Sequence, residues 1–288
     1  MDADSVSDTH AQALARIGSP GAYFGLPALD RPLRGVKRGY LFLIAGPPAG
    51  GKTLLTTHLV LNNLGLKTAW FTPDESHGFA VAKLAGLALG KSVEEIERMV
   101  NTPKGMTQLQ AFAEKYLNNV HVSEVAASDQ IQNELVRAAR HWGGGPPDLL
   151  VWDYAELLDP GYPADLKSKM DYFKQTIKRL NCYGVIIHQA KKGSTNVMAG
   201  YTDPSMDDLK EAGPAEAFQI LYCRRTPTMS QSDKQRQELH PSSEVWILKN
   251  KAAPGVPQNG ITFYLGQGGR LSSSEDIEPP TKKGLRYI

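Results

Sequence analysis

The stretch GPPAGGKT at residues 46–53 has the residue types of a phosphate-binding loop. It lies between an apolar run at 40–45 (YLFLIA) and a stretch of helical character at 53–64. It fits the pattern G-x-x-x-x-G-K-[ST], in which glycines allow backbone N–H groups to surround a phosphate at the start of a helix. The loop therefore predicts a nucleotide site formed by Gly46, Pro47, Pro48, Ala49, Gly50, Gly51, Lys52 and Thr53.

Two side chains of this loop are expected to have separate chemical roles. Lys52 should contact the outer phosphates, and the Thr53 hydroxyl should bind Mg²⁺. Such a site also uses a carboxylate from the end of a neighbouring buried strand. The sequence LLVWD supplies Asp153 after four apolar residues. We therefore predict ATP and Mg²⁺ as cofactors, with Thr53 and Asp153 as metal ligands.

Hydrolysis of a nucleotide also needs a group that orients the attacking water. The segment WFTPDES offers Asp74 and Glu75 after a second apolar run, and we favour Glu75. Gln189 ends the run VIIHQ and could hydrogen-bond a γ-phosphate. Glu156 is interpreted as a supporting or surface residue. His188 is interpreted as a packing residue, because it faces the other way from Gln189 on a strand.

The stretch VWILKNKAAPGV at 245–256 places two lysines after a buried run. Lys249 and Lys251 are two apart, so on a strand their ammonium groups share a face. Adjacent buried cations are costly, and a strongly negative group is expected beside them unless they reach solvent.

Apolar runs alternate with helical patterns, which predicts an α/β fold with a mostly parallel twisted sheet flanked by helices. The last two runs are expected to form a C-terminal β-hairpin. The predicted organisation is an N-terminal arm at 1–24 with a short helix at 9–17, an ATPase domain at 25–270 and a C-terminal tail at 271–288. The expected strands are 40–45, 68–72, 120–123, 149–152, 185–188, 219–223, 245–248 and 261–265.

The composition is that of an ordinary globular protein, with 41% hydrophobic and 22% charged residues among 288 and a net charge of +2. A polyanion would therefore be bound by local patches of charge. Cys182 and Cys223 form no CxxC pair, so a metal or disulfide role is not expected. The absence of a long apolar stretch predicts no membrane span, and a cytoplasmic location is expected.

The order of these motifs resembles the RecA-type ATPase core, and most of all the motor domain of DnaB-type replicative helicases. The resemblance covers roughly residues 25–270, from GLPALDRPLRG through the phosphate loop, LLVWDY and VIIHQ to DDLKEAG. It implies a RecA-like P-loop NTPase fold, a homo-oligomer that is commonly a hexameric ring, and ATP at the subunit interfaces. It also implies single-stranded DNA bound by loops near the axis. Here these loops would be 157–168 and 191–206, the second with Lys191 and Lys192.

The same resemblance implies that Lys249 and Lys251 reach the γ-phosphate held by a neighbouring subunit. DnaB-type helicases usually carry a lysine and then an arginine here, whereas KNKAAP is similar to the lysine pair of strand-exchange recombinases. The predicted function is an ATP-dependent helicase or translocase, and the compact size suits a phage or plasmid replication system. Three alternatives remain open: a recombinase or filament ATPase, a regulatory ATPase acting on a protein partner, and a nuclease on the same core.

Overall fold

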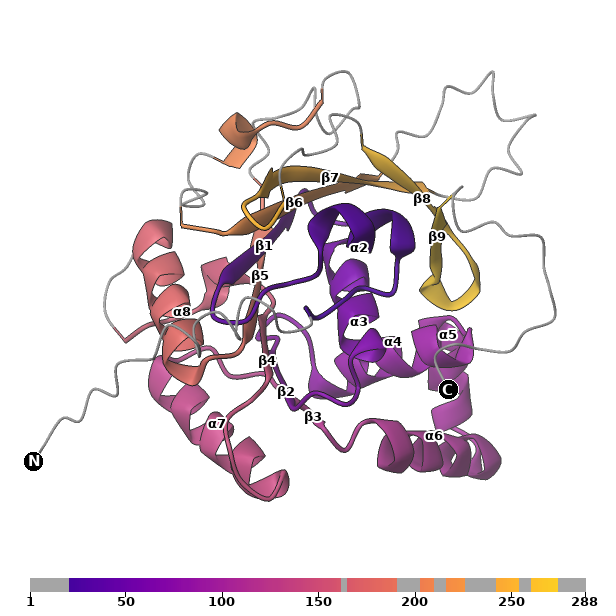
Figure 1. Cartoon of the computed structure of the whole chain (residues 1–288). Helices are drawn as coiled ribbons and strands as arrows, with labels where there is room; N and C mark the ends of the chain where they lie inside the picture. Colours follow the sequence, from indigo (N-terminus) through magenta and orange to yellow (C-terminus); the bar gives the residue numbers. More distant parts are fainter. Residues whose placement is uncertain are drawn as a thin grey trace, which may run out of the picture.

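A computed structural model describes residues 21–161, 165–190, 203–209, 216–225, 242–253 and 260–273. The central feature is one nine-stranded sheet (Figure 1). Its strands are β1 (Leu41–Gly46), β2 (Thr68–Phe71), β3 (Val120–Ser123), β4 (Leu149–Trp152), β5 (Tyr183–Gln189), β6 (Gln219–Arg225), β7 (Ser242–Asn250), β8 (Ile261–Leu265) and β9 (Leu271–Ser273).

The helices fill the connections between these strands. The α-helices are α2 (Pro27–Leu33), α3 (Lys52–Asn62), α4 (His77–Leu89), α5 (Val93–Val100), α6 (Pro103–Tyr116), α7 (Ser128–His141) and α8 (Leu166–Leu180). The short 3-10 helices are η1 (Ala155–Leu157), η2 (Met206–Leu209) and η4 (Gln267–Gly269).

The strand order is β3-β2-β4-β5-β1-β6-β7-β8-β9. In this spatial order, each strand up to and including β6 pairs in parallel with the next: β3, β2, β4, β5, β1 and β6. The register places the ends of three chemically important strands together, because Gly46 at the end of β1 pairs with Gln189 at the end of β5. Next to it, Trp152 of β4 pairs with Ile186 of β5. Ligands of parallel sheets bind at this carboxyl edge.

From β6 onward the sheet becomes antiparallel, through β7, β8 and β9. The β7–β8 pair is the expected C-terminal hairpin. The predicted fold class is confirmed: a mostly parallel sheet flanked by helices and closed by antiparallel strands. The sheet continues into β9, so the boundary expected at residue 270 falls before the last strand.

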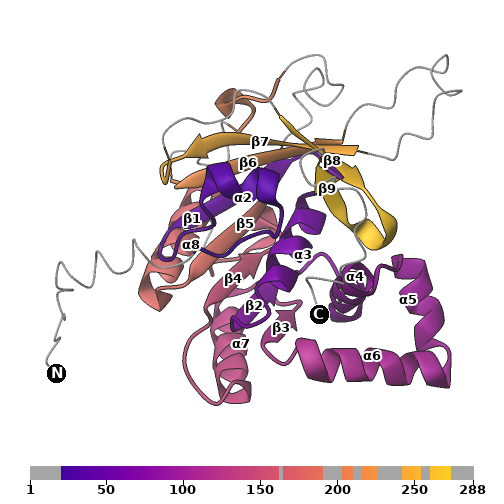
Figure 2. The ribbon, with the colours of Figure 1, turned by 45° about the vertical axis from the view of Figure 1, so that its right-hand side comes forward.

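Helices cover both faces of the sheet and form two hydrophobic layers. One layer packs α2, α3 and α4 with parts of α5 and α6 against one face. The other packs α7 and α8 against the opposite face. Figure 2 shows α5 and α6 extending away from the sheet beyond α4. The strands between the two layers are buried on both faces, as their continuous apolar sequences predict.

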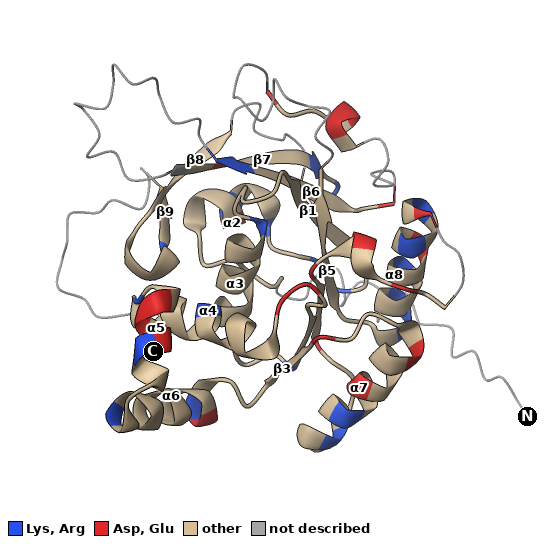
Figure 3. Cartoon of the chain, turned by 180° about the vertical axis from the view of Figure 1, so that it is seen from behind, with Lys and Arg blue, Asp and Glu red and all other residues tan. Residues whose placement is uncertain are grey.

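Local sequence signals set the helix boundaries that support the site. Helix α5 begins with a capping box in which Ser92 and Glu95 bond each other's backbone N–H groups. Helix α8 begins at the Asp165 cap, whose carboxylate accepts from Ser168 N–H. The outer faces of α7 and α8 carry charges of both signs, as Figure 3 shows, which agrees with the small net charge.

The sequence predicted each of the strands β1 to β8, with ends that differ by a few residues. It did not predict α2 or β9. The helix expected at 9–17, Lys191 and Lys192, the greater part of the loop at 191–206, and residues 274–288 lie outside the described residues. Within the described part, none of the helices is both long and apolar enough to cross a membrane.

Candidate functional site

The phosphate-binding loop is held against β6 by a close backbone contact. A side chain at Gly46 would place a Cβ 2.1 Å from the Cys223 carbonyl oxygen, and one at Gly50 would place it 2.7 Å away. Gly46 also has a φ of +151°, which disfavours other residues. Both glycines are therefore required by packing, and the carbonyl of Cys223 forms the floor of the loop.

Lys52 starts α3 and points back into the loop. Its ammonium group donates to the carbonyl oxygens of Gly46 at 2.9 Å and Pro47 at 2.7 Å. The residue is buried, and this burial lowers the pKa of Lys52 although the carboxylates of Asp153 and Glu156 act in the opposite direction. A desolvated cation inside a loop of N–H groups is suited to bind phosphate.

Thr53 and Asp153, which were predicted separately as metal ligands, are in direct contact. The Thr53 hydroxyl donates to Asp153 Oδ2 at 3.0 Å. Burial raises the pKa of Asp153 to about 6, with Glu75 adding to the effect and Thr53 opposing it. A buried carboxylate with so little positive charge around it is suited to bind a cation. Mg²⁺ needs few protein ligands beside the nucleotide's phosphates, so this fit holds although the described residues contain no cluster of three or more typical metal ligands.

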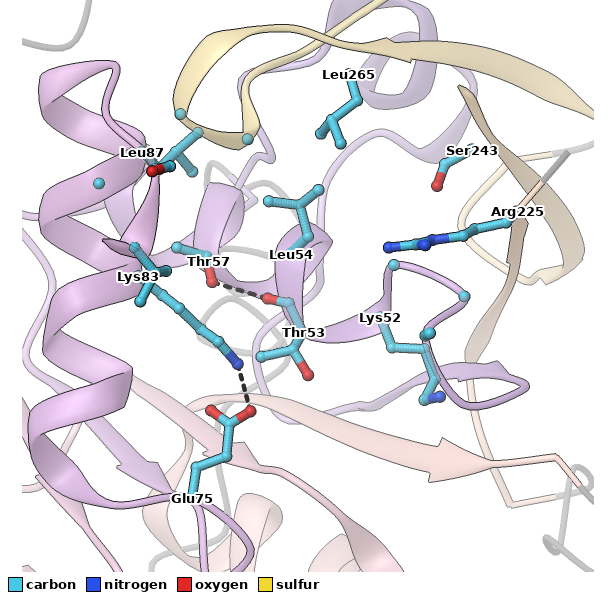
Figure 4. Close-up of a pocket in the computed structure, with 18 of the residues that line it drawn as sticks. Lys52, Thr53, Leu54, Thr57, Glu75, Lys83, Leu87, Arg225, Ser243 and Leu265 are labelled. Carbon is cyan, nitrogen blue, oxygen red and sulfur yellow. Dashed lines mark hydrogen bonds and ion pairs between the residues drawn. The ribbon is translucent and has the colours of Figure 1, made fainter. Parts of the chain in front are cut away.

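The two candidate bases occupy different places. Glu75 lines a pocket of about 420 Å³ together with Thr53, and its carboxylate is paired with Lys83 of α4 (Figure 4). Asp74 lies beside Tyr154, and burial together with the Asp74 carboxylate raises the pKa of that phenol. The geometry therefore favours Glu75 at the nucleotide pocket. Lys83 was missed from the sequence, where it is one of several lysines on helical stretches.

Glu156 and His188 form a contact that the sequence interpretation did not foresee. His188 Nδ1 lies 2.6 Å from Glu156 Oε1, and the same oxygen accepts the backbone N–H of Gln189 at 3.0 Å. The backbone oxygen of Glu156 accepts from Lys169 of α8 at 2.7 Å. Burial alone would raise the pKa of Glu156, but His188 and the Gln189 N–H hold it below its ordinary value. His188 is thus more than a packing residue. Gln189 is fixed beside Gly46, where the phosphate-binding loop begins.

Arg225 and Ser243 form the opposite wall of the pocket, on the far side of the loop from Glu75 and Lys83 (Figure 4). They come from the adjoining ends of β6 and β7, where Arg225 pairs with Ser243 in the strand register. Arg225 was not predicted as a site residue; the signal that could have found it is its position after the buried run ILYCR, at the carboxyl end of a parallel strand.

Lys249 and Lys251 lie at the other edge of the sheet. Because β7 runs antiparallel to β6, Lys249 pairs with Ile220 near the start of β6, whereas the loop packs near its end. Burial lowers the pKa of Lys249 and the neighbouring Lys251 adds to this, so the two cations are close together. Some of the expected negative charge comes from Glu216, which acts on Lys249 in the opposite direction and is paired with Lys174.

This arrangement can be compared with known proteins. The profile of the family described as "DnaB-like helicase C terminal domain" matches residues 21–261. The chain belongs to this family. At the level of the family it is therefore an ATPase motor domain of the helicase type.

Relatives of this DnaB-like domain agree with the assignment. The curated protein "Protein RecA" from Allochromatium vinosum is 25% identical over 279 residues, which cover 89% of this chain and 70% of that protein. A solved ATPase domain superposes with a TM-score of 0.70 at 18% identity, covering 94% of this chain and 99% of the other. A DnaB-like replicative helicase, solved in a study of its interactions with primase, has a TM-score of 0.67 at 18% identity, with 92% and 67% covered.

The DnaB-like domain thus presents one phosphate-binding edge and one lysine-bearing edge. At the first edge, a loop of N–H groups and Lys52 can hold phosphates, while Thr53 and Asp153 can hold Mg²⁺. Glu75 and Gln189 come from the two strands that flank β4, so they can orient a water and contact a terminal phosphate. ATPases of this family use nucleotide with Mg²⁺, and the residues present fit both.

Proposed function

We propose that the protein is an ATP-driven motor that assembles head-to-tail into a ring, commonly a hexamer in this family, and moves on single-stranded DNA. The observation that carries this proposal is the placement of the phosphate-binding loop and the lysine pair at opposite edges of one sheet. Lys249 and Lys251 cannot serve the nucleotide of their own chain from there. A second copy packed against that edge would bring its own nucleotide to them.

In this motor, each residue of the site has a defined task. Lys52 and the loop bind the phosphates of ATP, and Thr53 with Asp153 holds Mg²⁺. Glu75, rather than Asp74, orients the attacking water, and Gln189 contacts the γ-phosphate. Lys249 and Lys251 of the adjacent copy stabilise the charge that develops on the transferred phosphoryl group.

DNA is proposed to bind at the loops that follow β4 and β5, including Lys191 and Lys192. Support comes from the position of Gln189, which ends β5 just before these lysines. A loop attached directly to a phosphate-contacting residue can change when ATP is hydrolysed. One of the similar solved structures is a replicative helicase, which is consistent with this partner.

The deciding experiment is steady-state ATP hydrolysis with and without a single-stranded oligothymidine. We expect hydrolysis to rise with added DNA and to be lost in Lys52→Ala, which removes a phosphate contact without emptying the core. Neutralising Lys191 and Lys192 should preserve DNA-free hydrolysis and weaken the stimulation. A rate that is indifferent to DNA over a wide range of salt would favour a regulatory ATPase.

A further inference from the structure

A second pocket lies at the amino edge of the sheet, on the opposite side from the phosphate-binding loop. It has a volume of about 710 Å³, within the range of small-molecule sites. Its walls come from four separate parts of the chain: the segment before β1, the end of α8, the residue before β6 and the residues after β7. We refer to it as the amino-edge pocket.

The amino-edge pocket is lined by five cationic residues, namely Arg34, Lys37, Arg38, Lys178 and Lys251. Among the described residues, no carboxylate contributes to its lining. Only the Arg38 charge has a described partner, because its guanidinium donates to Asp148 at 2.8 Å and to the Asn181 carbonyl at 2.9 Å. In the described part of the chain the other four side chains have no ion pair.

The ordinary structural explanations account for only part of this charge. The carbonyl end of a helix favours a nearby cation, which explains Lys178 in the last turn of α8 and Arg34 at the C-cap of α2. Lys37 and Lys251 are not at the end of a helix, so this explanation does not cover them. Burial lowers the pKa of Lys37, and the nearby Arg34 adds to the effect. Cations that repel one another around one concavity are stabilised when an anion with several charges occupies it.

An exposed aromatic ring stands beside these cations. Tyr40 is 42% exposed and stacks on Phe218 with ring centroids 4.2 Å apart. Both rings line the amino-edge pocket. Positive charge next to an accessible aromatic face is the combination that binds nucleotide units, with phosphates on the cations and a base on the ring.

We propose that the amino-edge pocket is a second nucleotide-recognition site, which binds a run of phosphates on Arg34, Lys37 and Lys178 with a base against Tyr40. Two sources could supply this chemistry: the nucleotide held by an adjacent copy, or a nucleic-acid strand. The first source, an adjacent copy's nucleotide, rests on the proposed head-to-tail assembly, since Lys251 belongs both to the amino-edge pocket and to the lysine pair proposed to act on that nucleotide. The variants below therefore leave Lys249 and Lys251 unchanged.

The test compares Arg34→Ala/Lys37→Ala/Lys178→Ala with a control of matched charge, Arg98→Ala/Lys104→Ala/Lys115→Ala. The control residues are exposed positions on α5 and α6. One arm measures binding of inorganic tripolyphosphate to full-length chains that also carry Lys52→Ala, which weakens their own phosphate loop. The other arm measures binding of a fluorescent single-stranded oligothymidine across a range of salt concentrations. Thermal melting verifies that each variant is folded.

We expect the pocket variant to lose about tenfold or more in affinity in at least one arm while the control keeps its affinity. For the oligothymidine, the slope of log affinity against log salt should fall by about 2, since each phosphate contact on a single strand contributes ~0.7. A loss in the tripolyphosphate arm assigns the pocket to an adjacent copy's nucleotide. A loss in the oligothymidine arm, weakened further by Tyr40→Ala, assigns it to a strand.

Equal losses in the pocket variant and the control would mean that only overall charge matters, and would overturn the proposal. Unchanged binding in both arms by a folded pocket variant would also overturn it. Neither result affects the proposed ATPase, which is tested separately by the dependence of hydrolysis on Lys52.

Discussion

His188 Nδ1 lies 2.6 Å from the Glu156 carboxylate, and the oxygen that it contacts also accepts the backbone N–H of Gln189. A ring nitrogen this close to a carboxylate oxygen restrains both side chains. One carboxylate thus joins the segment after β4 to the end of β5, and Lys169 joins the same segment to α8. We interpret Glu156 and His188 as positioning residues for Gln189.

Glu156→Gln should lower kcat for ATP hydrolysis by roughly 10- to 100-fold, because small displacements of a group that contacts the reacting phosphate are costly. The KM for ATP should change little, since the phosphate loop is unaffected. His188→Asn can still donate to Glu156 and should be milder than His188→Ala. Steady-state kinetics with Glu114→Gln, an exposed change on α6, as control would measure this. A rise in KM with unchanged kcat would contradict the positioning role.

Lys83 pairs with Glu75 and so occupies the carboxylate that we propose as the water-orienting group. Lys83→Met should free it and raise DNA-independent hydrolysis by about two- to tenfold, the equivalent of one hydrogen bond of ~0.5–1.5 kcal/mol. The ratio of DNA-stimulated to basal rates should fall. If Lys83→Met instead loses activity to the extent of Glu75→Gln, Lys83 takes part in the reaction and does not restrain it.

Asp153→Asn should stabilise the nucleotide-free protein at neutral pH while abolishing Mg²⁺-dependent hydrolysis. The folded-state pKa of Asp153 is about 6, above its ordinary value of 3.8. The folded chain therefore holds this proton more tightly than the unfolded chain, and stability present below pH 3.8 is lost as the pH rises through 6. The free energy of unfolding lost in this way is up to about 3 kcal/mol.

The Asp153→Asn variant avoids this loss of stability, and its side-chain oxygen can still accept the hydrogen bond from the Thr53 hydroxyl. Thermal unfolding in EDTA should show the variant melting above the wild type at about pH 8, with the difference shrinking as the pH falls from about 6 toward about 4. Glu114→Gln again serves as the exposed control. An advantage that is constant with pH would show that ionisation of Asp153 is not its source.

Mixed assemblies test whether the lysine pair acts on an adjacent copy. Lys251→Ala chains keep an intact phosphate loop, and Lys52→Ala chains keep the lysine pair. Each should be nearly inactive alone, but some interfaces of a mixture combine both intact halves. DNA-free hydrolysis of the mixture should then exceed the sum of the two proteins. If subunits are shown to exchange and no ratio gives a gain, Lys251 does not act in trans.

Most of the scaffold could be predicted because its signals are local. Runs such as LFLIAG and LLVW are buried on both faces, and the loop pattern contains its own strand–turn–helix context. The parallel order followed from the alternation of strands and helices. The short strand β9 was missed because LSS has little strand character, and it is held through pairing with β8.

The contacts within the site were harder to predict because they join residues that are distant in sequence. Strand alternation correctly placed His188 on the face opposite Gln189. It could not show that the His188 side chain and the Gln189 backbone N–H meet the same carboxylate of Glu156. Similarly, the eight-residue separation of Glu75 and Lys83 spans a turn and part of α4, so their pairing depends on the direction in which α4 leaves the sheet.

The Cys223 carbonyl that supports the phosphate-binding loop belongs to β6, and β6 is paired along its length with β7, which carries Lys249. This two-stranded ribbon therefore has the phosphate-binding loop at one end and, at the other, the lysines that we propose to face an adjacent copy. In a closed ring, a shift of the loop upon losing a phosphate would be transmitted by this ribbon to the next site. The geometry of this backbone would then set the order in which successive subunits hydrolyse ATP.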